Sequence, residues 1–191
     1  MDGANVTGLV VDRARYAAGV VNLVRDVKGN ARRVALLANA DDPSSRALLA
    51  SLNQAAARIR VPVGVARVKT ADDYEAAFAQ WERLRLQVVL VGPTADARRA
   101  ADLALRYRLP AIALGSGFVE AGGLASYSIS SKELAARTMT YVARILNGAR
   151  PQSLPVEPLA AFQLALNLKI ARALEVDLPD ALLGRADALL Q

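Results

Sequence analysis

Short apolar runs alternate with amphipathic segments between residues 32 and 117, and this alternation limits the possible folds more than any other feature. Residues 34–38, 61–68, 87–92 and 110–114 read as strands, and the segments between them carry apolar residues at helical spacing. Three βα repeats of about 25 residues are typical of parallel sheets covered by helices. The sequence therefore predicts an α/β fold with a doubly wound parallel sheet. Pro62 near the start of its strand favours an edge position or a strand beginning.

Further elements are expected on both sides of these repeats. The predicted strands are 6–11, 124–128 and 162–167, the predicted helices are 13–27, 131–146 and 167–174, and an extended connector covers 149–158. A last helix is expected from Pro179 and Asp180 onward, because Leu182, Leu183, Ala186 and Leu189 follow at helical spacing.

Composition removes several classes of function. The 191 residues contain no His and no Cys, which excludes the Ser-His and Cys-His nucleophiles and most zinc sites. Hydrophobic residues make up 53% of the chain, yet no apolar run approaches the roughly 18 residues of a membrane span. The first residues lack the basic start and apolar stretch of a secretory signal, so we expect a cytoplasmic protein or one whose natural beginning is missing.

The net charge of +6 makes nucleic acid a partner to consider. However, the 24 Lys and Arg residues are scattered along the sequence, with Arg32-Arg33 and Arg98-Arg99 as the densest clusters. Aromatic residues amount to only 5%, which leaves few rings to stack on bases. We therefore predict no nucleic-acid partner.

The acidic pair Asp41-Asp42 follows the first strand of the repeats, as in a phosphoryl-accepting receiver domain. Such a site needs a further Asp after a neighbouring strand and a Lys after another. Gly92-Pro93 and Gly115-Ser116 stand at those places, so we interpret Asp42 as a helix cap or loop residue. No P-loop is present, and the dinucleotide-binding glycine pattern is incomplete. The prediction is therefore no metal, no cofactor and no catalytic residue.

Small hydroxyl and amide residues recur where the predicted strands end. They are Asn39, Ser44, Ser45, Thr94, Asp96, Ser116, Ser126 and Tyr127. Each of them also suits ordinary helix capping. Because ligands of open α/β sheets lie outside the carboxyl ends of the strands, their shared location predicts a polar small-molecule cleft.

Several segments in unbroken order resemble the ABC transporter substrate-binding proteins that include tryptophan and tyrosine binders. The similar segments are 5–8, 34–43, 109–112, 118–127, 141–151, 154–158, 162–169 and 182–187. The resemblance implies a type I periplasmic-binding-protein fold, in which two lobes close on a small solute. It also implies an ABC permease as partner and no catalysis. A Gly usually follows the family tyrosine, whereas Ser128 follows Tyr127 here.

Carried over by position, the resemblance places Thr7 near the crossing between lobes. Asn39 to Ser45 and Thr94 to Asp96 would face the cleft, and Ser116 and Tyr127 would close it. Residues 30–120 would form a complete second lobe. Residues 1–29 and 121–191 would form crossing segments and the C-terminal remainder of a partial first lobe.

Two readings of the function remain open. The first is the solute-binding component of an ABC importer, or a truncated relative, that binds a small polar organic molecule such as an amino acid in the periplasm. The alternative is a cytoplasmic α/β ligand-sensing or interaction module that dimerises through its incomplete lobe. That remainder should fold back on its own lobe or on a second copy, because unpartnered strands expose apolar edges. An enzyme using Asp96 or Lys132 with Tyr127 would need a group whose pKa lies near neutral.

Overall fold

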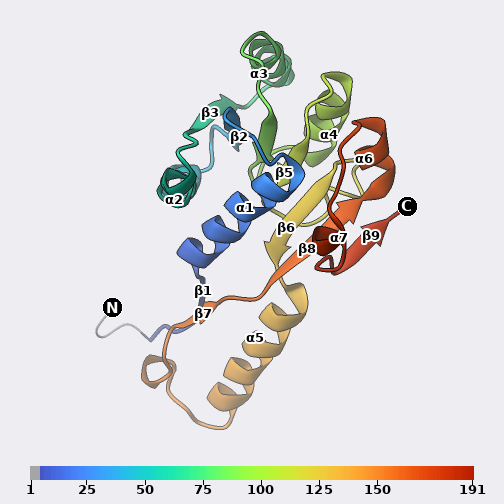
Figure 1. The fold of residues 1–191 in the computed structure, drawn as a ribbon. Coiled ribbons are helices and arrows are strands. Elements are labelled where there is room, and N and C mark those ends of the chain that lie inside the picture. Colours follow the sequence, from blue (N-terminus) through green and yellow to red (C-terminus); the bar gives the residue numbers. More distant parts are fainter. Residues whose placement is uncertain (1–4) are drawn as a thin grey trace.

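The computed structural model describes residues 5–191 and contains a mixed α/β domain with a smaller unit beside it (Figure 1). The strands are β1 Leu9–Val11, β2 Val34–Asn39, β3 Val63–Val68, β4 Val88–Val91, β5 Ala111–Ala113, β6 Ala125–Ile129, β7 Glu157–Leu159, β8 Phe162–Asn167 and β9 Ala188–Leu190. The helices are α1 Arg13–Val27, α2 Ser45–Ala56, α3 Ala71–Arg83, α4 Ala97–Arg106, α5 Ser131–Leu146, α6 Leu168–Ala173 and α7 Asp180–Leu183. Two short 3₁₀ helices cover Ala57–Ile59 and Pro151–Ser153.

Seven strands form one sheet in the order β3-β2-β4-β5-β6-β8-β9. Strands β2 to β6 pair in parallel, β8 is antiparallel to β6, and β9 is parallel to β8. Strand β3 lies at one edge, as the proline before it predicted. The carboxyl ends of β2, β3, β4 and β5 therefore meet at one edge of the sheet, which is where a ligand site was expected.

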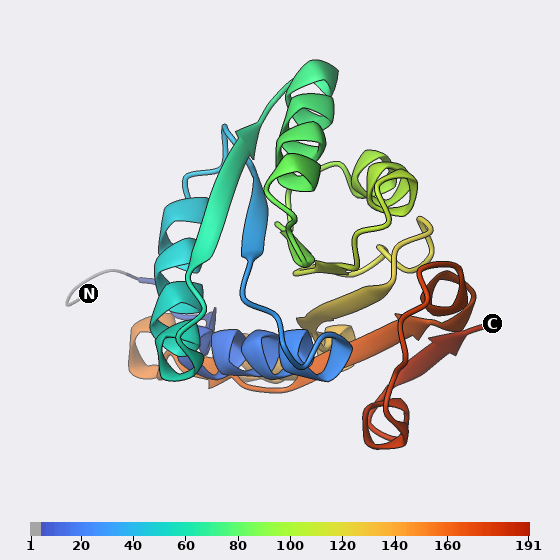
Figure 2. The same cartoon turned by 45° about the horizontal axis from the view of Figure 1, so that its top comes forward.

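Helices cover both faces of this sheet (Figure 2). Leu36, Leu90 and Ile112 point to the side of α1 and α2, whereas Leu37 and Val89 point to the side of α3 and α4. Adjacent residues belong to opposite cores because successive side chains of a strand alternate between faces. Burial on both faces explains why these strands are continuous apolar runs rather than alternating ones. The doubly wound fold class is confirmed.

Side-chain caps mark the starts of α1, α3, α4, α5 and α6. Asp12 accepts a hydrogen bond from the Arg15 amide at the start of α1, and Ser130 accepts one from the Glu133 amide at the start of α5. At α3 the cap is reciprocal between the threonine before the helix and Asp73. Capping of the free amides in the first turn sets where each strand-to-helix connection ends.

A smaller unit, made of residues 5–11 and 131–159, lies apart from the sheet (Figure 1). In this β1–β7 unit, β1 pairs in parallel with β7, and the Tyr141 hydroxyl of α5 donates to the Pro155 carbonyl at 2.6 Å. Most of α5 is exposed, including Met139 and Leu146 at 63% and 81%. None of the helices in the described residues, α5 included, has the length and apolar character to cross a membrane.

Strands from outside the predicted range 30–120 also belong to this sheet. Strands β6, β8 and β9, expected in the remainder of another lobe, are hydrogen-bonded into the same sheet as β2 to β5, and α1 packs against its core. These strands cover the edge that β5 would otherwise leave open. The division of the chain at residues 30 and 120 stays a prediction. Folding back on the same domain is the arrangement observed. Whether the β1–β7 unit is part of a second lobe stays a proposal.

The last predicted helix is also shorter than expected. Helix α7 ends at Leu183, and Ala188–Leu190 forms β9 beside β8. The leucine spacing fits a helix, but the exposed edge of β8 offers backbone partners that a continued helix would leave unused. Similarly, part of the expected connector, Glu157–Leu159, pairs with β1 as β7.

Candidate functional site

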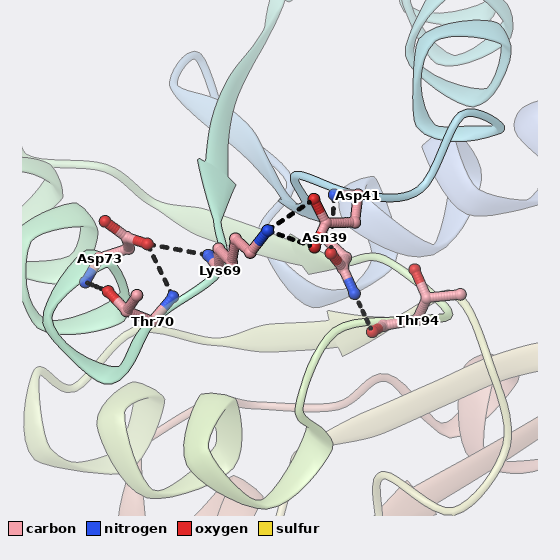
Figure 3. Close-up of polar contacts among 6 residues, drawn as sticks. All are labelled: Asn39, Asp41, Lys69, Thr70, Asp73 and Thr94. Atoms are coloured by element: carbon pink, nitrogen blue, oxygen red, sulfur yellow. Dashed lines mark hydrogen bonds and ion pairs between the residues drawn. The ribbon is translucent and has the colours of Figure 1, made fainter.

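A polar hollow lies where β2, β3 and β4 end, between the first turns of α3 and α4. It has a volume of about 350 Å³. The polar and aromatic side chains that line it come from Asn39, Lys69, Thr70, Tyr74, Thr94, Asp96 and Arg99. Figure 3 shows how several of them face one another across the strand ends. The size falls within the range of small-molecule sites.

Asn39 is the last residue of β2 and lies at the centre of this edge. Its Nδ2 donates to the Thr94 carbonyl at 3.2 Å, and its Oδ1 accepts from the Asp41 amide at 2.9 Å. These contacts join the loop after β2 to the loop after β4 (Figure 3). The side-chain amide therefore has a fixed orientation, with further donor and acceptor capacity open to a ligand.

Lys69 brings a positive charge to the end of β3. Its Nζ pairs with Asp41 Oδ2 at 3.0 Å, and both side chains are more than half exposed (Figure 3). Such surface pairs contribute little to stability, so a negatively charged ligand can compete with Asp41 for the ammonium. The backbone amides of Lys69 and Thr70 both donate to Asp73 Oδ2, at 2.9 and 2.7 Å. These bonds lower the pKa of Asp73, with the bond from Thr70 first.

Asp42 lies behind the hollow and joins two of its loops. Its Oδ2 accepts from the Thr94 hydroxyl at 2.8 Å, and its Oδ1 accepts from the Ser44 amide at 2.8 Å. Hydrogen bonds from the side chains of Ser44 and then Thr94 hold the pKa of Asp42 below its usual value. The interpretation of Asp42 as a loop residue at the start of a helix agrees with these contacts.

The α4 side of the hollow combines a phenol, a carboxylate and a guanidinium. The Asp96 amide donates to the Tyr74 hydroxyl at 2.7 Å, and Asp96 Oδ1 caps α4 by accepting from the Arg99 amide at 3.0 Å. The Arg99 guanidinium lies 5.9 Å from the centre of the Tyr74 ring, and its Nε lies 3.7 Å from Asp96 Oδ2. Burial raises the pKa of Tyr74, so its hydroxyl stays protonated at neutral pH.

This arrangement suits binding by charge and hydrogen bonding. Cationic groups flank the hollow on both sides, and amide, hydroxyl and carboxylate groups lie between them. Within residues 5–191, no group of His, Cys, Asp and Glu residues has the geometry of a metal site. In the same residues, no hydrogen bond or ion pair links Asp96 or Lys132 with Tyr127, the three residues of the enzymatic alternative.

Three of the nine residues expected at the site line this hollow: Asn39, Thr94 and Asp96. Ser44 and Ser45 lie next to it at the start of α2, where both contribute hydrogen bonds to Asp42. Ser45 is itself buried. Their part in the site is therefore to position the loop after β2.

The other four expected residues lie elsewhere. Ser126 is a buried residue of β6, and its hydroxyl accepts a hydrogen bond from the Val119 amide at 3.3 Å. The Thr7 hydroxyl donates to the carbonyls of Leu154 and Pro155 at 3.0 and 3.2 Å, inside the β1–β7 unit. Ser116 lines a separate hollow of about 210 Å³ beside β6 and β8. Tyr127 stacks on Tyr16 with ring centres 5.4 Å apart and packs under α1.

Sequence reasoning missed four residues of the hollow: Lys69, Thr70, Tyr74 and Arg99. Lys69 and Thr70 come directly after β3, and Asn39 comes directly after the predicted strand 34–38. The rule applied to the other strands would therefore also have selected Lys69 and Thr70. Thr70 caps α3, and Tyr74 is a buried core residue of that helix. Both have these structural roles and also line the hollow.

Comparison with known proteins places the chain in a family. The family model described as ABC transporter substrate binding protein matches residues 1–190. No curated protein matches the chain significantly.

Solved structures agree with this match in fold. A conserved domain protein from Vibrio cholerae O1 biovar El Tor superposes with a TM-score of 0.82 at 24% identity, over 98% of this chain and 64% of that one. An ABC domain in complex with L-Trp from Streptococcus pneumoniae has a TM-score of 0.77 at 20% identity, over 91% and 62%. A ligand-free, open substrate-binding protein with adhesive properties from Clostridium difficile has a TM-score of 0.75 at 21% identity, over 99% and 64%. The chain thus spans less than two thirds of each of these structures.

Proposed function

The chain belongs to the ABC transporter substrate-binding protein family, and we propose that it binds a small polar organic solute such as an amino acid at the hollow between α3 and α4. The main support for this proposal is that Asn39, Lys69 and Thr94 lie close together at the carboxyl ends of three adjacent strands (Figure 3). Open α/β sheets bind ligands at that edge.

The charges around the hollow favour a solute that carries a carboxylate. Lys69 and Arg99 offer cations on opposite sides, and Asp96 can receive the ammonium of an amino acid. Asn39 and Thr94 supply directional hydrogen bonds between these charges. The complex of a structural relative with L-Trp supports an amino acid as the class of solute to test first.

The further parts of the proposal follow from membership in the family. The chain would deliver its solute to an ABC permease, act in the periplasm, and bind without catalysis. In this proposal Asn39, Thr94 and Asp96 contact the solute, and Ser44 and Ser45 hold the loop behind it. Ser116 belongs to a neighbouring hollow, while Thr7 and Tyr127 have structural roles.

A thermal-shift screen followed by titration calorimetry tests the proposal. The protein is measured with each of the twenty amino acids, L-Trp included, and with acetate as a simple carboxylate. We expect at least one amino acid to raise the melting temperature, because a ligand that binds only the folded state stabilises it. Asn39→Ala and Lys69→Met should each weaken that binding about tenfold or more, since a hydrogen bond to a charged group contributes about 1.5–3 kcal/mol.

Asn22→Ala is the matched control, because Asn22 is an exposed residue of α1 outside the hollow. It should leave the affinity unchanged. If no amino acid changes the melting temperature at 5 mM, or if all three variants weaken binding equally, the hollow is not the solute site.

A second candidate function, self-association, is favoured by the exposed face of α5. Leu134, Met139, Val142 and Leu146 are all exposed on this helix, between 39% and 81%. Contiguous exposed apolar surface of this kind marks interaction sites. A second copy of the chain that packs its α5 against this face would give the homodimer of the alternative reading.

The mass in solution tests this second candidate. Static light scattering should give twice the chain mass at micromolar concentration, and Met139→Ser with Leu146→Ser should shift the mass toward the monomer. Both side chains are exposed in the single chain, so the variant should still fold. A monomeric mass for the unaltered chain over the whole concentration range contradicts self-association.

A further inference from the structure

One short pattern occurs at three places where a helix passes into the next strand. It consists of two arginines separated by one apolar residue and followed by another apolar residue: Arg58-Ile59-Arg60-Val61, Arg83-Leu84-Arg85-Leu86 and Arg106-Tyr107-Arg108-Leu109. The three copies precede β3, β4 and β5. We refer to these three segments as the RxR turns.

The second arginine of each RxR turn has a left-handed backbone conformation. The φ angles of Arg60, Arg85 and Arg108 are 54°, 51° and 52°. Glycine, or less often asparagine, is the residue that favours this conformation at the end of a helix. Arginine at these three positions therefore costs backbone stability in each turn relative to glycine.

The sheet brings the three turns to one edge. Because β2, β3, β4 and β5 are parallel, the segments before them all lie at the amino ends of the strands, opposite the polar hollow. Lys28 and Arg33 lie at this edge too. Together with Arg85, Arg108 and three acidic residues, they line a depression of about 600 Å³; the acidic residues are Asp26, Glu175 and Asp177. We call this edge, with its RxR turns, the basic edge.

Few of these charges are neutralised within the chain. Arg106 pairs with Glu75 at 2.8 Å and Arg108 with Glu175 at 3.8 Å, both in solvent. In the described part of the chain, Arg58, Arg60, Arg83 and Arg85 have no ion-pair partner within 4.0 Å. All six arginines of the RxR turns are exposed.

Apolar side chains are exposed between these arginines. Leu84, inside the second turn, is 55% exposed, and Leu105, next to the third, is 41% exposed. An edge that combines arginines with solvent-facing leucines matches the two components of a lipid interface, anionic headgroups and the upper acyl region.

We propose that the basic edge binds the surface of a membrane that contains anionic phospholipid. The arginines contact phosphate groups, and Leu84 and Leu105 enter the headgroup layer. The polar hollow then faces away from the lipid, because it lies at the other end of the same strands. The exposed leucines favour lipid over nucleic acid, since they have no partner on a phosphate backbone and Tyr107 is the only aromatic residue of the turns. This inference does not depend on solute binding.

Vesicle co-sedimentation with the full chain tests the proposal. Vesicles of phosphatidylcholine alone are compared with vesicles that contain phosphatidylglycerol at about one third of the lipid. Binding is expected only to the second kind and should weaken from 50 to 300 mM salt, because surface charges are screened. In the variant Arg60→Gly, Arg85→Gly, Arg108→Gly, binding should fall about 100-fold, since each basic residue at an anionic surface contributes about 1 kcal/mol.

Glycine suits the left-handed positions, so this triple variant should melt at the same or a higher temperature than the unaltered chain. Loss of binding then reflects the lost charges rather than loss of the fold. A control with the same change in net charge is Arg13→Gln, Arg46→Gln, Arg150→Gln, because these exposed arginines lie away from the basic edge. It should keep at least half of the binding.

Three results would overturn the proposal. The first is equal binding to both kinds of vesicle, and the second is an equal loss in the two triple variants. The third is tighter binding to a 20-base-pair DNA duplex than to the phosphatidylglycerol vesicles at the same phosphate concentration and salt, which would assign the edge to nucleic acid.

Discussion

Asp42 shows how a single carboxylate connects two loops of the candidate site. It accepts hydrogen bonds from the Thr94 hydroxyl and the Ser44 amide, and its pKa is lowered. A carboxylate whose pKa is lower in the folded than in the unfolded state stabilises the folded protein at pH values above its unfolded pKa, which is about 3.9 for Asp. This stabilisation is lost as the pH falls through the lower pKa of the folded state.

We therefore expect Asp42→Asn to lower the free energy of unfolding at pH 7 by about 0.5 kcal/mol, a small effect because the carboxylate is close to solvent. The difference from the unaltered chain should shrink as the pH falls below 4. Urea denaturation of both proteins at pH values from 7 to 3 measures this. Asp177→Asn, at an exposed residue for which no contact with Asp42 or the hollow is observed, should show no such pH-dependent difference. A constant difference at every pH would contradict the assignment of the stabilisation to the ionised group.

Gly19 of α1 and Tyr127 of β6 are in close contact. The Tyr127 ring lies so close to Gly19 of α1 that a Cβ there would overlap its hydroxyl and ring carbons. The same ring stacks on Tyr16, whose hydroxyl donates to the Tyr127 and Leu114 carbonyls at 2.7 and 2.9 Å. Tyr127 is thus a contact between helix and sheet rather than a side chain of the polar hollow.

Gly19→Ala should lower the free energy of unfolding by about 1–3 kcal/mol, because overpacking outweighs the gain in helix propensity. The double variant Gly19→Ala, Tyr127→Leu should recover part of this loss, since the smaller side chain makes room for the added methyl group. Thermal and urea denaturation of the single and double variants measure the coupling. If Gly19→Ala stabilises the protein, the close packing of α1 on β6 is not as described.

At the scale of elements, β9 shows where sequence reasoning reached its limit. The leucines near the end of the chain have helical spacing, and nothing local reveals the open edge of β8 beside them. Asp187 fixes the outcome: its carboxylate accepts from the Leu164 amide at 2.8 Å, and its amide donates to the Leu164 carbonyl at 2.8 Å. A pairing between segments far apart in the sequence cannot be seen in the pattern of either one.

Asp187→Ala should loosen β9 locally. Removal of one hydrogen bond of about 1 kcal/mol at a sheet edge should speed amide hydrogen exchange in residues 188–190 about fivefold, with little change in the centre of the sheet. Asp187→Asn keeps an acceptor oxygen and should restore most of the protection. Equal exchange rates in all three proteins would show that β9 is held by its backbone pairing alone.

The parts of the fold that rest on local patterns were predictable. Helices α1 and α5 and strand β8 have the predicted bounds. Asn39, Thr94 and Asp96, which line the hollow, were selected because each follows the end of a strand predicted from the sequence. Ser116 also follows a predicted strand but lines a different hollow. The position of a residue after a strand predicts at which edge of the sheet it lies, but not where along that edge.

At the scale of the whole molecule, the charges are less scattered than the sequence suggested. The densest pairs in the sequence are Arg32-Arg33 and Arg98-Arg99, but the RxR turns lie about 25 residues apart and meet only because parallel strands bring every helix-to-strand connection to one edge. The chain thereby acquires two polar edges of different character. One has mixed charges and small polar groups, and the other is rich in arginine.

These two edges should act independently. Strands of four to six residues separate them, which corresponds to about 13–20 Å. Sites so far apart, with no shared side chain, usually contribute additively to free energy. The triple variant Arg60→Gly, Arg85→Gly, Arg108→Gly should therefore leave the melting-temperature shift caused by an amino acid within about 1 °C of the unaltered value, and Asn39→Ala should leave vesicle binding unchanged. A four-way comparison of the unaltered chain, the two variants and their combination, assayed for both activities, measures the coupling between the edges. A change in solute affinity of more than about threefold on vesicle binding would reveal that the sheet transmits a signal from one edge to the other.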